Sequence, residues 1–146
     1  MTDVAIMRMV ISTQPRLLHV LRGVVRYYAR EGGFSDNDVH TLAMAVDEAA
    51  ANVIRHTYHN NPGGRMALEV RDFPDRLEFV IEDSGPKVQP ERVRPRPLED
   101  VRPGGLGTFF IKCFTDSSCY DETFTEGNRL RLVKFKGNKR IDGLGD

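Results

Sequence analysis

The alternation of apolar and polar residues predicts a strand followed by two helices in the first part of the chain. Residues 4–11 are apolar and rich in β-branched side chains, which favours a strand. Apolar residues then recur with helical spacing over residues 17–28, after Pro15, whose fixed φ suits the first turn of a helix. We expect this first helix to end at Gly32 and Gly33.

A second helix is predicted from a cap at Ser35 and Asp38 until it frays near His59. One side of this helix is apolar with a period close to 3.6 residues, which is typical of a helix that packs against a core. The apolar positions are Val39, Leu42, Ala43, Val46, Ala50 and Val53.

The other side of this helix carries a candidate site. Glu48 and Asn52 are four residues apart and share one face, with His56 one turn further on. A carboxylate and an amide oxygen suit a magnesium ion that takes its other ligands from water and phosphate. Glu48 could instead accept a proton as a general base. A solvated polar face would explain the same pattern, and the helix alone does not decide between these readings.

Two strands are predicted next, at residues 65–73 and 76–83, joined by a tight turn. Alternation along both gives the hairpin one face that packs and one that points outward. The second strand ends in Asp83, two residues before Gly85. An aspartate at this place can accept a hydrogen bond from an exocyclic amine, and a glycine lets a flat ring approach the backbone. An ordinary Asp-Ser-Gly turn is the alternative.

Residues 86–103 are rich in proline and arginine, which excludes a helix or an inner strand and predicts a lid or a disordered loop. The sequence GGLGT at residues 104–108 then opens an apolar helix, and free backbone amides at such a start can bind phosphate. A simple flexible turn is the alternative. Strands at residues 117–124 and 128–135 complete the pattern as a second hairpin.

This order of elements predicts an α+β fold, a two-layer sandwich in which helices cover one face of a mostly antiparallel, mixed sheet. We expect a single domain over residues 1–136 and a polar, disordered tail over residues 137–146.

The 21 basic and 21 acidic residues cancel, so the net charge of the chain does not indicate a nucleic acid or membrane partner. No apolar run is long enough for a signal or a membrane span, so we expect a cytoplasmic protein. Cys113 and Cys119 fit no metal pattern and are predicted as buried free thiols.

Three motifs in this order carry a resemblance to a known superfamily. The segments are VDEAAANVIRHTY, DSGP, GGLGTFFIKCFTD and GNRLRLVKF, and the likeness extends from about Ser12 to Lys136. The chain resembles the gyrase, histidine kinase and MutL superfamily with its Bergerat-type ATP-binding fold. Within it, the chain is most similar to the anti-sigma factor serine/threonine kinases of the RsbW and SpoIIAB type. It departs from many members of the superfamily at Pro86, where a second glycine is common.

The resemblance implies a role for each matching residue. Glu48 is expected to be the catalytic base, Asn52 to coordinate Mg²⁺, Asp83 to bind the adenine amine of ATP, and Gly85 to lie beside the ring. The role of His56 stays open between a structural position and a ligand contact. The remaining nucleotide-binding positions lie in the glycine-rich turn and the lid: Gly104, Gly105, Leu106, Gly107 and Thr108, with one lid arginine among Arg92, Arg94, Arg96 and Arg102. Arg102 is preferred among these because it is nearest to the glycines.

The function implied by the resemblance is that of an anti-sigma factor with ATP-dependent protein-serine/threonine kinase activity. Its partners would be an anti-sigma factor antagonist of the STAS type, which it phosphorylates, and a sigma factor, which it sequesters, and the kinase would be a homodimer. One alternative is an ATP-binding partner-switching module without kinase activity. The catalytic half of a histidine kinase is disfavoured because only thirteen residues precede the first helix. A domain that binds no nucleotide would require three ordered coincidences.

Overall fold

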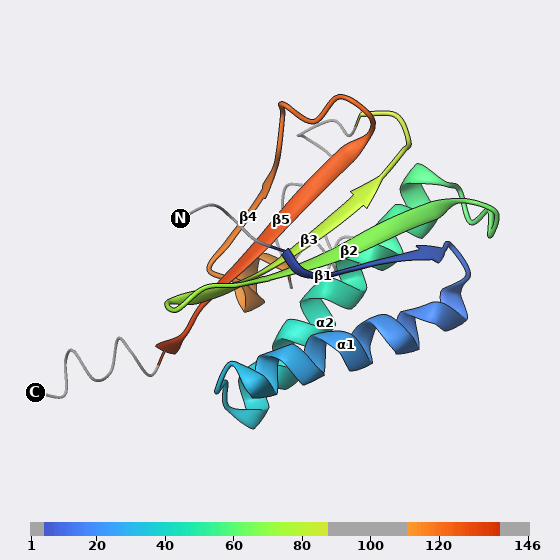
Figure 1. The fold of residues 1–146 in the computed structure, drawn as a ribbon. Helices are drawn as coiled ribbons and strands as arrows, with labels where there is room; N and C mark the ends of the chain where they lie inside the picture. Colours follow the sequence, from blue (N-terminus) through green and yellow to red (C-terminus); the bar gives the residue numbers. More distant parts are fainter. Residues whose placement is uncertain (1–4, 88–110, 138–146) are drawn as a thin grey trace, which may run out of the picture.

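The computed structural model describes residues 5–87 and 111–137, and shows one five-stranded sheet with two helices against one face (Figure 1). The strand order is β1-β2-β3-β5-β4, and every pairing is antiparallel. The strands are β1 (Ala5–Ser12), β2 (Arg65–Asp72), β3 (Arg76–Asp83), β4 (Ser117–Tyr120) and β5 (Asn128–Phe135). The helices are η1 (Pro15–Leu17), α1 (Leu18–Glu31), α2 (Asp36–Asn52) and η2 (Val53–Thr57).

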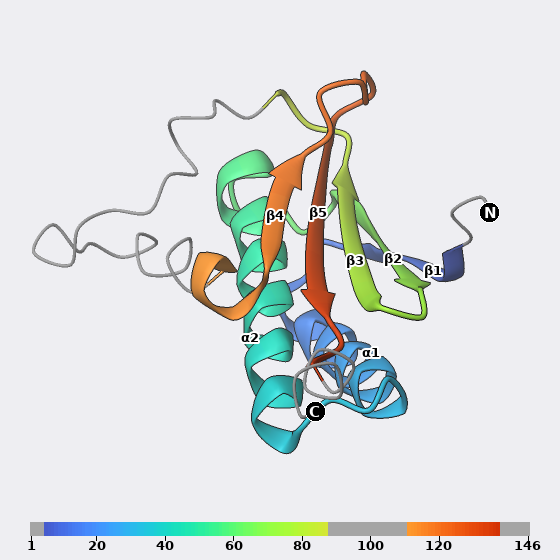
Figure 2. The same ribbon diagram turned by 90° about the vertical axis from the view of Figure 1, so that its left-hand side faces the viewer.

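The core lies between the sheet and the two helices, which confirms the α+β sandwich (Figures 1 and 2). Phe79 and Leu68 from the central strands are fully buried against Leu21 and Val25 of α1 and Val46 of α2. Burial of such aliphatic and aromatic side chains is the main favourable term for this fold. The apolar stripe predicted on the second helix is buried in the same cluster, except that Val53 is partly exposed.

The end of α2 differs from the single α-helix that was expected. Ser35 caps the start as predicted, since its Oγ accepts a hydrogen bond from the Asp38 amide at 3.1 Å. After Asn52 the chain continues as the π-helix η2, in which the Tyr58 amide donates to the Val53 carbonyl at 3.1 Å. A π turn widens the helix and is common at functional sites. The predicted second helix therefore changes from an α-helix to a π-helix directly after Asn52.

The outer face of the sheet is covered by ion pairs and is less open to solvent than the alternation predicted. Glu78 in the central strand β3 is only 1% exposed. Its Oε2 accepts a hydrogen bond from Arg76 Nε at 2.7 Å and lies 3.6 Å from Nη1 of Arg131. The aliphatic stems of such arginines cover the sheet while their charges pair with the carboxylates. Val80 on the same face is buried as a result.

The second hairpin has a shorter first strand than expected. β4 ends at Tyr120, and the strand predicted over residues 117–124 is wrong beyond that point. Asp121 forms a local turn because its Oδ1 accepts hydrogen bonds from the amide of Thr123 at 3.0 Å and from its hydroxyl at 2.6 Å. Aspartate commonly competes with strand pairing in this way.

The limits of the domain stay a prediction, because most of the predicted tail, residues 138–146, lies outside the described residues. None of the helices in the described ranges is long and apolar enough to cross a membrane.

Candidate functional site

Glu48 and Asn52 lie on the same face of α2, as predicted, and their oxygens converge on one positive group. Glu48 Oε2 and Asn52 Oδ1 each accept a hydrogen bond from Nη2 of Arg55, and both distances are 2.7 Å. Arg55 comes from the π turn that follows Asn52. The carboxylate and the amide oxygen therefore form a partly exposed site that already holds a cation.

Asp83 is held at the end of β3 by two donors. Its side chain is buried, and its Oδ1 accepts hydrogen bonds from the Gly85 amide at 2.9 Å and from Asn128 Nδ2 at 3.0 Å. Asn128 Nδ2 also donates to the Pro86 carbonyl at 2.8 Å. Within the described ranges both hydrogen bonds to this carboxylate go to Oδ1. This arrangement fixes the orientation of the Asp83 carboxylate.

The π turn supports the turn that contains Asp83 and Gly85. A side chain at Gly85 would bring its Cβ to 2.0 Å from Cγ2 of Thr57, so only glycine fits at this distance. The hydroxyl of Tyr58 accepts a hydrogen bond from the Ser84 amide at 3.0 Å and donates to the Arg65 carbonyl at 2.7 Å. The end of the motif helix thus holds the second predicted motif in place.

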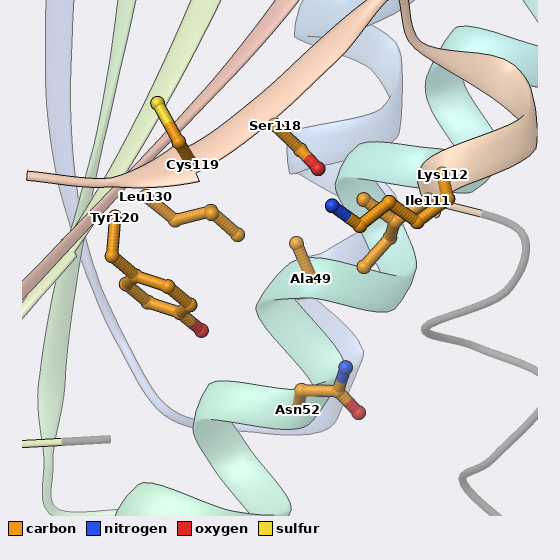
Figure 3. A pocket seen from close by; sticks show the side chains of 8 residues that line it. All are labelled: Ala49, Asn52, Ile111, Lys112, Ser118, Cys119, Tyr120 and Leu130. Carbon is orange, nitrogen blue, oxygen red and sulfur yellow. The ribbon is translucent and has the colours of Figure 1, made fainter. Parts of the chain in front are cut away.

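A pocket opens between α2, the helical residues 111–114 and β4 (Figure 3). Asn52 and Ala49 form one wall, and Tyr120 extends from the opposite strand. The full lining consists of Ala49, Asn52, Ile111, Lys112, Ser118, Cys119, Tyr120 and Leu130. An apolar cleft with a few polar groups at its edge is the usual form of a small-molecule site.

Tyr120 links this pocket to Asp83. Burial and the nearby negative charge of Asp83 raise the pKa of Tyr120 to about 12. The hydroxyl therefore keeps its proton at neutral pH, where it can donate a hydrogen bond. Asp83 and Asn52, which are far apart in the sequence, are thus both close to Tyr120.

The titration of Tyr120 gives a direct check of this geometry. We expect the tyrosinate absorbance of the wild type minus that of Tyr120→Phe to rise near pH 12, while a solvent-exposed phenol ionises near pH 10. Because the pKa is higher in the folded chain, Tyr120 contributes stability that is present below about pH 10 and is lost as the pH rises toward 12. A difference curve centred at the ordinary value in the folded protein would place Tyr120 in solvent.

Several other predicted positions have a different outcome. His56 is exposed on the π turn, and its role stays open.

Cys113 and Cys119 are both exposed, so the prediction of buried thiols is wrong. The reason is that β4 is an edge strand, and that Cys113 lies on the exposed side of the short helical segment at residues 111–114. The predicted lid and glycine-rich turn, with Arg102, Gly104, Gly105, Leu106, Gly107 and Thr108, lie outside the described residues.

Comparison with known proteins identifies the family. The family model described as the histidine kinase-like ATPase domain matches residues 11–134. The chain belongs to this family. The match includes both Asn52 on α2 and Asp83 at the end of β3, as well as the strand β5 that supplies Asn128.

Within the histidine kinase-like ATPase family, the curated relatives are of the type suggested by the sequence motifs. The serine-protein kinase RsbW of Halalkalibacterium halodurans is 28% identical over 148 residues, which cover 93% of this chain and 89% of the relative. The serine-protein kinase RsbW of Bacillus subtilis is 22% identical over 142 residues, which cover 92% of this chain and 88% of the relative. These matches confirm the resemblance to the RsbW type.

Solved structures share the fold of this family member at low sequence identity. The crystal structure of the RsbU and RsbW domains of a Mycobacterium tuberculosis protein has a TM-score of 0.62 at 12% identity, and covers 88% of this chain but 31% of the solved one. The SiaB–SiaC complex from Pseudomonas aeruginosa contains a chain with a TM-score of 0.58 at 10% identity. The match covers 90% of this chain and 89% of the solved one.

Proposed function

We propose that the chain binds ATP with Mg²⁺ in the pocket beside α2 and transfers the γ-phosphoryl group to a hydroxyl of a partner protein. The observation that carries the proposal is the convergence of Glu48 Oε2 and Asn52 Oδ1 on a single cationic nitrogen next to this pocket. Catalysis at such a site depends on positioning and on neutralising phosphate charge, with a carboxylate to receive the hydroxyl proton.

The donor set fits magnesium. The guanidinium of Arg55 stands where a cation is bound by two hard oxygens, the ligand type that Mg²⁺ prefers. Throughout the described part of the chain, no three His, Cys, Asp or Glu side chains cluster as a metal site. An ion held by few protein ligands takes its others from water and phosphate, as Mg²⁺ does in nucleotide sites. Asn52 would hold the ion, which would neutralise charge on the phosphates.

The adenine end of the nucleotide is assigned to Asp83. Oδ2 would accept a hydrogen bond from the adenine amine, and Gly85, whose close approach to Thr57 fixes the turn, would lie beside the ring. Tyr120 would line the same cleft with its protonated hydroxyl. The phosphates would bind at residues 104–108, with Arg102 contributing charge, as the motif predicts.

The partners follow from the relatives. Since curated relatives are named serine-protein kinase RsbW, the phosphate acceptor would be a serine or threonine of an anti-sigma factor antagonist of the STAS type. In the other half of the proposed partner-switching cycle, the chain would sequester a sigma factor. A homodimer and a cytoplasmic location belong to the same proposal, and sedimentation of the purified protein tests the dimer.

Labelled ATP tests the transfer step. The protein is incubated with γ-labelled ATP, Mg²⁺ and a purified candidate antagonist, and we expect label on the antagonist only when all three are present. A Ser/Thr→Ala variant of the acceptor position should remove the label. Stable partner binding with no transfer to any candidate would contradict the kinase proposal.

One observation favours a second candidate function, an ATP-binding partner-switching module without kinase activity. Oε2 of Glu48, the proposed base, already accepts a hydrogen bond from Arg55, so this oxygen is occupied while the pair persists. The two functions differ in the same assay, because a module would bind ATP and its partner and leave the label on the nucleotide.

Replacing the proposed magnesium ligand has a separate expected result. Mg²⁺ is expected to increase the affinity for nucleotide, and Asn52→Ala should make this increase smaller by about tenfold, because the ion has few protein ligands to lose. Affinity measured in EDTA should change little. Calorimetry of ADP binding with and without Mg²⁺ measures both values, and an unchanged gain would mean that Asn52 is not a ligand.

A further inference from the structure

Arg55 is the one member of the site that the proposed function leaves without a role. It follows Asn52 by one turn and belongs to the π-helix η2. One nitrogen, Nη2, donates both to the proposed base Glu48 and to the proposed metal ligand Asn52. A Mg²⁺ ion bound at Asn52 would be a second cation beside the guanidinium, so the two would repel each other and compete for the same amide oxygen.

We propose that Arg55 is a built-in counter-cation of the nucleotide site, which holds Glu48 and Asn52 in the nucleotide-free chain and is displaced from Asn52 by the incoming divalent cation. This inference rests on the proposed function, since it assigns the Mg²⁺ site to Asn52. It makes Arg55 a positioning residue that keeps the two oxygens directed at one point before the metal arrives.

The burial of the pair suits a contact that can be exchanged. The side chain of Arg55 is 39% exposed and that of Glu48 is 25% exposed, so the guanidinium can move into solvent without leaving a buried charge. The ion pairs of Glu78 are different, because its side chain is 1% exposed and the loss of an arginine there would leave a buried carboxylate. The outer-face pairs are fixed parts of the sheet, and the Arg55 pair is a replaceable one.

Displacement couples two events at the site. While Arg55 bridges the two oxygens, the carboxylate that would accept the hydroxyl proton is neutralised. Release of Asn52 to the metal breaks one of the two contacts that hold the guanidinium over Glu48. The base is therefore freed more readily when a metal nucleotide is bound than when the pocket is empty.

The experiment compares Arg55→Gln with Arg55→Lys and with a matched control. Arg22→Gln breaks an ion pair of similar exposure on the residue next to Glu48, since Arg22 Nη1 lies 2.6 Å from Asp47 Oδ1. Each variant and the wild type are titrated with a fluorescent ADP analogue in EDTA and at increasing Mg²⁺, and thermal unfolding confirms that each is folded. The quantity compared is the ratio of nucleotide affinity with Mg²⁺ to that without.

We expect Arg55→Gln to raise this ratio by about three- to tenfold and to lower the half-saturating Mg²⁺ concentration, since removal of a competing half-exposed cation has an effect of that size. Arg55→Lys and Arg22→Gln should stay close to the wild type. An unchanged ratio for Arg55→Gln would overturn the inference alone. If the affinity fell equally with and without Mg²⁺, Arg55 would bind the nucleotide itself, and if neither affinity changed, Arg55 would not compete with the metal. Failure of the wild type to bind in both conditions overturns the proposed function together with it.

Discussion

Replacement of Glu48 by Gln is expected to lower phosphoryl transfer at least about 100-fold, which is the usual contribution of a general base. Gln keeps the size of the side chain and an acceptor oxygen for Arg55, so the fold and the Asn52 contact should persist. Because the proposed base would act on the hydroxyl of the partner and would not hold the nucleotide, affinity for ATP should stay within about threefold of the wild type.

Asp47→Asn is the matched control for this variant. Asp47 precedes Glu48 on α2, its side chain is 26% exposed against 25% for Glu48, and it is also paired with an arginine. Asp47 pairs with Arg22 of α1, whereas Glu48 and Asn52 share Arg55, so its loss should leave transfer near the wild-type rate. Initial rates with labelled ATP compare the two variants, and normal transfer by Glu48→Gln would show that another group serves as the base.

Replacement of Asp83 by Asn is expected to weaken ATP binding about 10- to 100-fold, the cost of turning one buried hydrogen bond into a mismatch. The amide oxygen of Asn can still accept the hydrogen bonds from Gly85 and Asn128, which places the amide nitrogen where Oδ2 was. Two donors, this nitrogen and the adenine amine, would then face each other. The carbonyl oxygen of guanine would meet a donor instead, so the preference for ATP over GTP should narrow.

Competition of ATP and GTP against a fluorescent nucleotide measures this change in specificity. Asp72→Asn is the control, because Asp72 ends the neighbouring strand β2 and pairs with Lys136 at the surface, with its side chain 41% exposed. Circular dichroism confirms that both variants keep the sheet. An Asp83→Asn variant with unchanged preference for ATP would show that this residue does not contact the base.

The periodic parts of the fold could be predicted because each depends on residues that are near in sequence. The apolar stripe of α2 and the alternation in β2 and β3 fix which faces are buried, and the Ser35 cap fixes where α2 begins. Glu48 and Asn52 were found for the same reason, since helical spacing alone brings them to one face. The same spacing also brings Arg55, three residues after Asn52, to this face, but Arg55 was not predicted as a site residue.

The residues that were missed depend on contacts between distant segments. Asn128 begins β5 and reaches Asp83 because β5 pairs with β3, a pairing that skips the chain between them. Tyr120 is near Asp83 because β4 pairs with β5. Asn128 lies in the segment GNRLRLVKF that carries the resemblance, but this segment assigned no role to it, and no local pattern marks Tyr120. A prediction of the strand order would have been needed to place them there.

Calorimetric titration of the purified protein with ATP, with and without Mg²⁺, tests the central claim most directly. The geometry of Asn52, Asp83 and the pocket predicts saturable binding of one nucleotide per chain that tightens when Mg²⁺ is present. No heat of binding in either condition, for a protein shown to be folded, would contradict the assignment of this pocket to a nucleotide.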